Sequence, residues 1–105
     1  MKNWRRYEIL LPLRFNNGKR VPKKLLALTV EELEERFGAL SSETQVIHGR
    51  WRQAKRRYQD ELMRIWVDCE RDPEVTAFFT GFKKRLKVRF RQKEIWLITH
   101  TIQLL

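Results

Sequence analysis

The sequence predicts an α+β fold in which a four-stranded antiparallel sheet carries two helices on one face. Three observations lead to this prediction. Strand-like alternation marks residues 7–15 and 94–103, two further strand-like segments adjoin at residues 44–51 and 58–69, and helical periodicity fills the two remaining intervals. The element order is therefore β-α-β-β-α-β. A chain of 105 residues has room for a single domain, residues 1–105.

The first strand is expected over residues 7–15, where Tyr7, Ile9 and Leu11 alternate onto one face. Pro12 has no amide hydrogen to donate, so the strand should be bulged or have a free side there. The Asn-Asn-Gly sequence that follows predicts a turn, and the basic segment 19–28 is expected to be loop with some helix.

The first helix is expected to begin at Thr29, because Thr29 and Glu32 have the spacing of a capping box. Gly38 should end it. Val30, Leu33 and Phe37 would then form its buried stripe. On this interpretation, the glutamates at its start complement the helix dipole.

The two central strands should form a hairpin, with residues 52–57 as a basic loop and its tip near residues 53–56. The tip has no Gly or Asn-Gly, so the turn type stays open. In the second strand Met63, Ile65 and Val67 share one face. Leu62, Arg64 and Trp66 share the other.

Asp72 followed by Pro73 predicts the start of the second helix, since Asp is a good N-cap and Pro is favoured at the first helical position. An apolar stripe follows, and the basic residues project from the opposite side. The stripe consists of Val75, Phe78, Phe79, Phe82, Leu86 and Phe90. Residues 94–103 form the last strand, which is apolar on both faces.

This element order is that of the ferredoxin-like plait, and the match covers nearly the whole chain. The chain also resembles a class of small bacterial proteins of about this length. The resemblance lies in residues 7–13, in Glu35-Arg36-Phe37-Gly38 and in Glu94-Ile95-Trp96. It implies the same fold and carries no activity with it.

Charge is the strongest functional signal. The chain has 23 Lys and Arg against 13 Asp and Glu, a net charge of +10, and the cations gather in four blocks away from the acids. Such segregation favours binding to phosphate or to an acidic partner over a surface that is merely solvated. We expect nucleic acid, DNA or RNA, to contact a basic hairpin and the second helix. The predicted contacts are Arg50, Arg52, Lys55, Arg56, Arg57, Lys84, Lys87 and Arg91.

A second surface is expected on the sheet face turned away from the helices. Leu62, Trp66 and Trp96 would lie there, and a large exposed apolar patch usually marks an interface. The predicted partner is a second copy of the chain or another protein. The alternative is that the C-terminal tail or the basic loop covers this face.

Enzymatic interpretations have less support. Some ferredoxin-like nucleases of CRISPR systems hold a metal with an acid near the end of the first strand, and Arg14-Phe15-Asn16 at that place argues against this mode. Asp68, Glu70 and Asp72 could ligate a hard cation, and His48 and His100 could transfer protons, but strand exits, caps and sheet surfaces explain them better. RNA recognition by aromatic residues of the third strand would depend on Trp66, aided by Trp96, without the usual Gly-aromatic pattern. The four glycines are scattered, so we expect no cofactor, and we expect no metal.

The expected setting is the cytoplasm. The single cysteine, Cys69, excludes an internal disulfide. No apolar run is long enough to cross a membrane, and the N-terminus has no cleavage-site pattern of a signal peptide. The sequence therefore predicts a non-enzymatic binding module, with a protein-interaction subunit that does not bind nucleic acid as the alternative.

Overall fold

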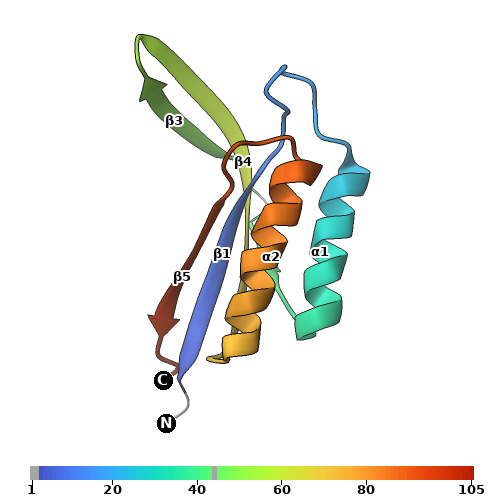
Figure 1. The fold of residues 1–105 in the computed structure, drawn as a ribbon, viewed down its shortest axis with the longest axis vertical. Helices are drawn as coiled ribbons and strands as arrows, with labels where there is room; N and C mark the ends of the chain where they lie inside the picture. Colours follow the sequence, from blue (N-terminus) through green and yellow to red (C-terminus); the bar gives the residue numbers. More distant parts are fainter. Residues whose placement is uncertain (1–2, 44) are drawn as a thin grey trace.

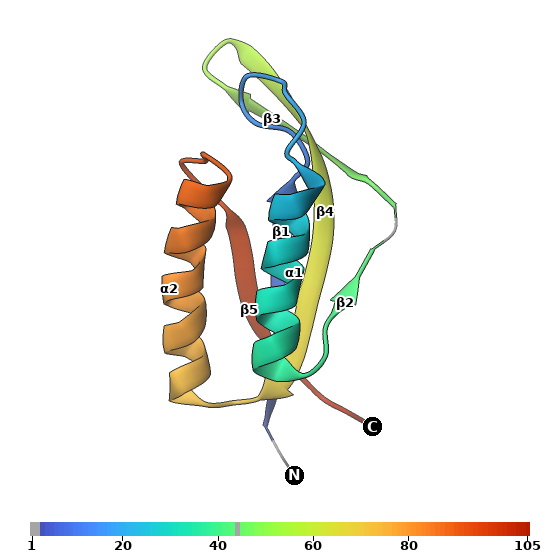
Figure 2. The ribbon, with the colours of Figure 1, turned by 90° about the vertical axis from the view of Figure 1, so that its right-hand side faces the viewer.

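The computed structural model describes residues 3–43 and 45–105, and it has the predicted α+β architecture. A five-stranded antiparallel sheet carries two helices on one face (Figures 1 and 2). The strand count exceeds the prediction by one because a two-residue strand precedes the second predicted strand. The elements in chain order are β1 (Trp4–Pro12), α1 (Lys23–Phe37), β2 (Ser41–Ser42), β3 (Ile47–Gln53), β4 (Arg56–Glu70), α2 (Pro73–Arg89) and β5 (Trp96–Ile102).

Strands β2 and β3 follow each other along the outer edge of β4. Ser42 pairs with Ile65, and pairing resumes where Ile47 meets Leu62. The edge strand therefore has two residues more than β4 over this interval, and such an excess interrupts a ladder as a bulge does. The expected strand 44–51 is thus displaced toward the hairpin tip, and Thr44, its expected first residue, lies outside the described residues.

The core lies between the sheet and the two helices, and its sheet side is as predicted. Tyr7, Ile9 and Leu11 of β1 lie beside Ile65 and Val67 of β4, all buried. The predicted stripe of α2 packs onto them, with Val75 and Phe78 partly buried at its margin. The buried apolar residues from the helix layer are Leu33, Phe79, Phe82, Leu86 and Phe90.

The start of α2 confirms its sequence signal. The Asp72 carboxylate accepts a hydrogen bond from the amide of Glu74 at 2.9 Å, and Pro73 is the first helical residue. The helix then continues to Arg89, one residue before the buried ring of Phe90.

The start of α1 was predicted wrongly. The helix begins at Lys23, and Thr29 lies within it rather than capping it. The Thr29 hydroxyl is buried, donates to the Leu25 carbonyl at 2.9 Å and accepts from Arg89 of α2 at 2.9 Å. Residues 31–35 therefore lie in the second half of the helix, where they do not complement its positive end. Gly38 ends the helix as expected, in the left-handed conformation at φ 78°.

Strand β1 begins and ends three residues earlier than predicted. Its pairing with β5 stops at Leu10 and Trp96. The amide of Leu13 donates to Glu61 on the β4 side, so the nitrogen of Pro12 points toward the β5 side. Pro12 thus lies at the free side that its missing amide hydrogen requires.

The β3–β4 hairpin projects beyond the rest of the sheet as a two-stranded arm (Figures 1 and 2). We define the arm as residues 47–61, because β1 pairs with β4 only from Leu62 onward. The expected loop 52–57 is mostly strand, since Arg52 pairs with Arg57 and only Ala54 and Lys55 form the turn. Residues 50–60 are all exposed.

Both views place the same parts of the chain at the arm end of the molecule. The β1–α1 connection, the start of α1, the end of α2 and the α2–β5 connection all lie there (Figures 1 and 2). The two termini and the start of α2 lie at the opposite end. The longest dimension of the molecule is 48 Å, so the two ends are well separated.

Candidate nucleic-acid interface

The arm carries five of the predicted contact residues as exposed cations. None of the five forms an ion pair with any part of the chain that the structure describes. They are Arg50, Arg52, Lys55, Arg56 and Arg57. Two acids at the base of the arm are engaged, because Asp60 accepts from Trp51 and Glu61 lies 3.5 Å from Arg14. The outer arm therefore presents uncompensated positive charge.

The pleat divides the arm into two faces. Arg50, Arg52 and Arg57 alternate onto one face, while Trp51 and Tyr58 pair across the strands on the other. The two rings stack with their centroids 4.1 Å apart and their planes 12° from parallel. Trp51 remains 46% exposed and Tyr58 36% exposed.

Our sequence reasoning missed this aromatic pair. The sequence places Trp51 only at the end of one expected strand and Tyr58 only at the start of the next. The two residues are equidistant from the turn at Ala54 and Lys55, which is the spacing of a cross-strand pair. The expected tip near residues 53–56 is correct, but treating residues 52–57 as a loop separates Trp51 from Tyr58 and hides this pairing.

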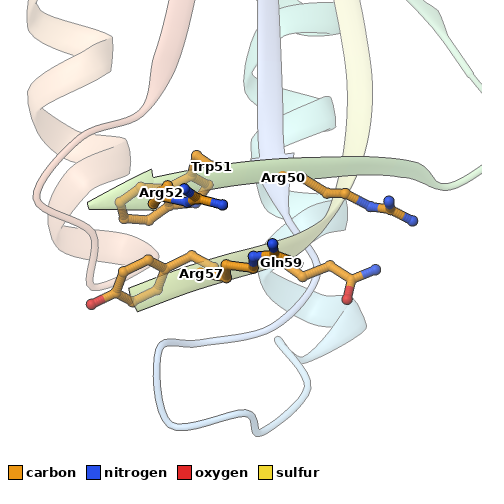
Figure 3. Close-up of a pocket in the computed structure, with 6 residues that line it drawn as sticks. Arg50, Trp51, Arg52, Arg57 and Gln59 are labelled. Carbon is orange, nitrogen blue, oxygen red and sulfur yellow. The ribbon is translucent and has the colours of Figure 1, made fainter. Parts of the chain in front are cut away.

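The two faces border one open hollow of about 510 Å³ on the arm. It is lined by Arg50, Trp51, Arg52, Arg57, Tyr58 and Gln59 (Figure 3). Arg50 and Gln59, which pair across the strands, extend side by side. Because every lining residue is exposed, the hollow is a surface for a large ligand and does not enclose a small one.

The helix contacts are at the same end of the molecule but are partly neutralised. The Glu94 carboxylate lies 2.8 Å from the Lys83 ammonium and 3.6 Å from that of Lys87. The hydrogen bond from Lys83 lowers the pKa of Glu94. Lys84 and Arg91 are exposed, and the Arg91 guanidinium lies over the Phe15 ring at 4.9 Å.

Further cations outside our predicted set extend the positive surface at the arm end. Lys19 and Arg20 lie in the β1–α1 connection, and Lys23 and Lys24 open α1, all exposed. The first turn of α1 has no acid, so these lysines add to the positive end of the helix dipole. At the opposite end cations are mixed with the acids of the α1 terminus and the α2 start.

The predicted interface on the outer sheet face is not a continuous apolar patch. Trp66 lies between two guanidinium groups, that of Arg64 at 4.2 Å and that of Arg6 at 5.6 Å from the ring centroid. Leu62 packs over Gly49 at the base of the arm, 3.2 Å from where a Cβ there would lie. Trp96 alone of the three is well exposed, at 59%.

Ion pairs hold those guanidinium groups in place. Arg64 bridges Glu8 of β1 and Glu43, which follows β2, and Arg6 pairs with Asp68 at 2.7 Å. These hydrogen bonds raise the pKa of Arg64, mainly through Glu8, and that of Arg6, mainly through Asp68. Two polar side chains of the sheet itself, Arg64 and Arg6, therefore lie over the Trp66 ring.

The candidate catalytic residues are not brought together. Asp68 pairs with Arg6 and Asp72 caps α2. Within residues 3–43 and 45–105, no three His, Cys, Asp or Glu side chains gather as a metal site would require. His48 on β3 and His100 on β5 are separated by β4 and β1. Burial raises the pKa of the Cys69 thiol, which opposes a role as nucleophile.

Comparison with known proteins supports the fold. No protein-family model matches the chain, and no curated protein matches it. Among solved structures it is similar to a phage SAM lyase in complex with S-methyl-5'-thioadenosine, with a TM-score of 0.68 and 12% identity over 99% of this chain and 92% of that one. It is also similar to CutA from Synechococcus elongatus, with a TM-score of 0.61 and 7% identity over 97% of this chain and 79% of that one. At these identities the likeness establishes the fold alone. No helix in the described part of the chain is long and apolar enough to span a membrane.

Proposed function

We propose that this chain is a non-enzymatic module that binds nucleic acid by contacting phosphates with its arm. The observation that carries the proposal is the group of five exposed cations on a projecting two-stranded ribbon, with no ion pair to them among the described residues. A ribbon of this kind fits the major groove of duplex DNA and can also lie along a single strand. Lys84, Lys87 and Arg91 provide a second set of phosphate contacts at the same end.

Contacts of this type supply affinity with little sequence preference, because phosphates carry no sequence information. Each neutralised phosphate releases a condensed counterion, so affinity falls as salt rises. The cytoplasm, where nucleic acid is available and a lone thiol such as Cys69 stays reduced, is the setting we propose.

Salt dependence tests the proposal. We expect the wild-type protein to bind labelled oligonucleotides at about 50 mM salt and to lose affinity steeply above it. Arg52→Gln with Arg57→Gln should weaken binding to every sequence similarly. The double variant should flatten the slope of log affinity against log salt by about 1.4 on a single strand or about 1.8 on duplex DNA.

The matched control removes two exposed cations from the opposite end, Arg36→Gln with Arg71→Gln. It makes the same change in net charge and should leave the slope unchanged. Absence of binding to DNA and RNA at low salt would reject the proposal. Equal effects of the two double variants would also reject it, and an acidic protein partner would then become the leading candidate.

A further inference from the structure

The stacked pair of Trp51 and Tyr58 lies on the arm, outside the hydrophobic core. Residues 56–60 of β4 pair only with β3, and the helices cover the other end of the sheet (Figure 2). Large aromatic side chains are mostly buried in domains of this size. Here two of them stay on a thin ribbon in contact with solvent.

The geometry of the pair allows the aromatic ring of a ligand to stack on it as a third ring. The indole Nε1 of Trp51 donates to the Asp60 carboxylate at 2.8 Å, which fixes the orientation of the indole. Tyr58 covers one side of that indole, and because both residues remain partly exposed, further ring surface is accessible. A flat aromatic ligand can extend such a stack without any rearrangement of the arm.

Cations border this aromatic surface. Arg56 pairs with Gln53 and by the pleat lies on the same face as the rings, two residues from Tyr58. Arg52 and Arg57 line the same hollow from the opposite face. Aromatic rings for bases and guanidinium groups for the adjoining phosphates are the combination that single-strand-binding proteins use.

We infer that the nucleic acid held by the arm is single-stranded, and that an unpaired base stacks on the Trp51–Tyr58 pair. Arg56 and the Arg52–Arg57 pair then contact the phosphates on either side of that base. In a duplex the faces of each base are covered by its neighbours, so a duplex can use the arginines but not the rings. This inference rests on the proposed function and specifies its ligand.

The test compares a labelled single strand of about 12 nucleotides with the duplex of the same sequence. The wild type should prefer the single strand. Trp51→Val keeps a β-branched residue in the strand and removes the ring, and it should weaken single-strand binding about 5- to 150-fold while leaving duplex binding nearly unchanged. Trp51→Phe keeps a ring in the pair and should retain most of the affinity.

Trp4→Val is the matched control, because Trp4 is also an incompletely buried tryptophan on a strand but lies at the start of β1, outside the arm. It should bind like the wild type. A wild type that prefers the duplex overturns the inference, as does a Trp51→Val variant that loses affinity equally for both probes. In either case the salt slope of the Arg52 and Arg57 variant still decides the proposed function independently. If Trp51→Val unfolds the arm, Trp51→Phe and the wild-type preference decide the outcome.

Discussion

Arg52 of β3 lies directly opposite Arg57 of β4, so two like charges face each other across the arm with no acid between them. Like charges in this position destabilise a strand pair. The turn that joins the strands contains a second unfavourable feature, a non-glycine residue with positive φ at Ala54. Both features lower the stability of the arm. An anion bound between the two arginines would reduce the repulsion between them.

Replacing Arg57 by Glu should separate stability from binding. The new carboxylate faces Arg52 and replaces a repulsion by an ion pair, so the arm should become more stable by a few tenths to about 1 kcal/mol. Nucleic-acid affinity should fall, because a negative charge enters the phosphate surface. Thermal unfolding and oligonucleotide titration measure the two effects. A variant that is more stable and binds as well as the wild type would show that this pair does not contact phosphate.

Replacing Ala54 by Gly should stabilise the turn. Ala54 has φ 56°, a left-handed conformation that costs a residue with a Cβ about 1 kcal/mol relative to glycine. Amide hydrogen exchange in the arm should slow by up to about fivefold. Ala77→Gly, in the exposed middle of α2, is the control and should destabilise by about 1 kcal/mol. Faster exchange in the Ala54→Gly arm would contradict the assigned turn geometry.

Replacing Glu94 by Gln should strengthen binding. Glu94 neutralises Lys83 and Lys87, so its loss returns positive charge to the end of α2. The wild type should show a related pH dependence. A carboxylate whose pKa is lowered stays charged until the pH falls below its ordinary range, and the ion pairs are lost only there. Around neutral pH the variant should therefore bind more tightly at low salt, and this difference should shrink toward acidic pH, where wild-type Glu94 is also neutral.

The element order, the core of the sheet and the whole of α2 could be predicted from the sequence because local signals and burial agree there. At α2 the cap, the Pro and the apolar stripe all indicate the same helix. At Thr29 the local signal and the burial disagree. The spacing of a capping box is present, but the buried Thr29 hydroxyl forms hydrogen bonds with Leu25 and Arg89 inside the helix. A partner 60 residues away in sequence decides that position, and no local pattern reveals it.

The candidate site was predicted in its charge but not in its shape. The arm cations and the hairpin could be read from composition and alternation. The position of the tip, near residues 53–56, was predicted correctly. The turn type could not be predicted, because Ala54 takes a conformation that sequence patterns reserve for glycine or asparagine. The expected loop 52–57 also included four residues that belong to the strands, and this hid the Trp51–Tyr58 pair. On the outer sheet face, the ion pairs that hold Arg6 and Arg64 beside Trp66 could not be predicted either, because they join different strands and depend on the register.

The last prediction concerns self-association, which we expect at the free edge formed by β5. This strand pairs only with β1, and its seven residues include no Lys, Arg, Asp, Glu or Pro, the residues that usually protect an edge from pairing with another chain. Two copies paired in antiparallel fashion about Thr99 would place Trp96 opposite Ile102 of the partner subunit and would bring together no like charges at neutral pH. Strand β5 is not part of the arm, so pairing along its edge engages none of the arm cations in backbone hydrogen bonds.

Light scattering of the wild-type protein at micromolar concentration should therefore give about twice the chain mass. Thr99→Lys places a charge at the centre of the edge, and the two lysines of a dimer would face each other, so this variant should be monomeric. Thr80→Lys makes the same replacement at an exposed position on α2 and should leave the dimer intact. A wild type that is monomeric across the concentration range would contradict the prediction, because β5 would then remain unpaired along its free edge. If Thr99→Lys remained dimeric instead, the contact would have to lie elsewhere, and Trp96→Lys would then test the outer sheet face.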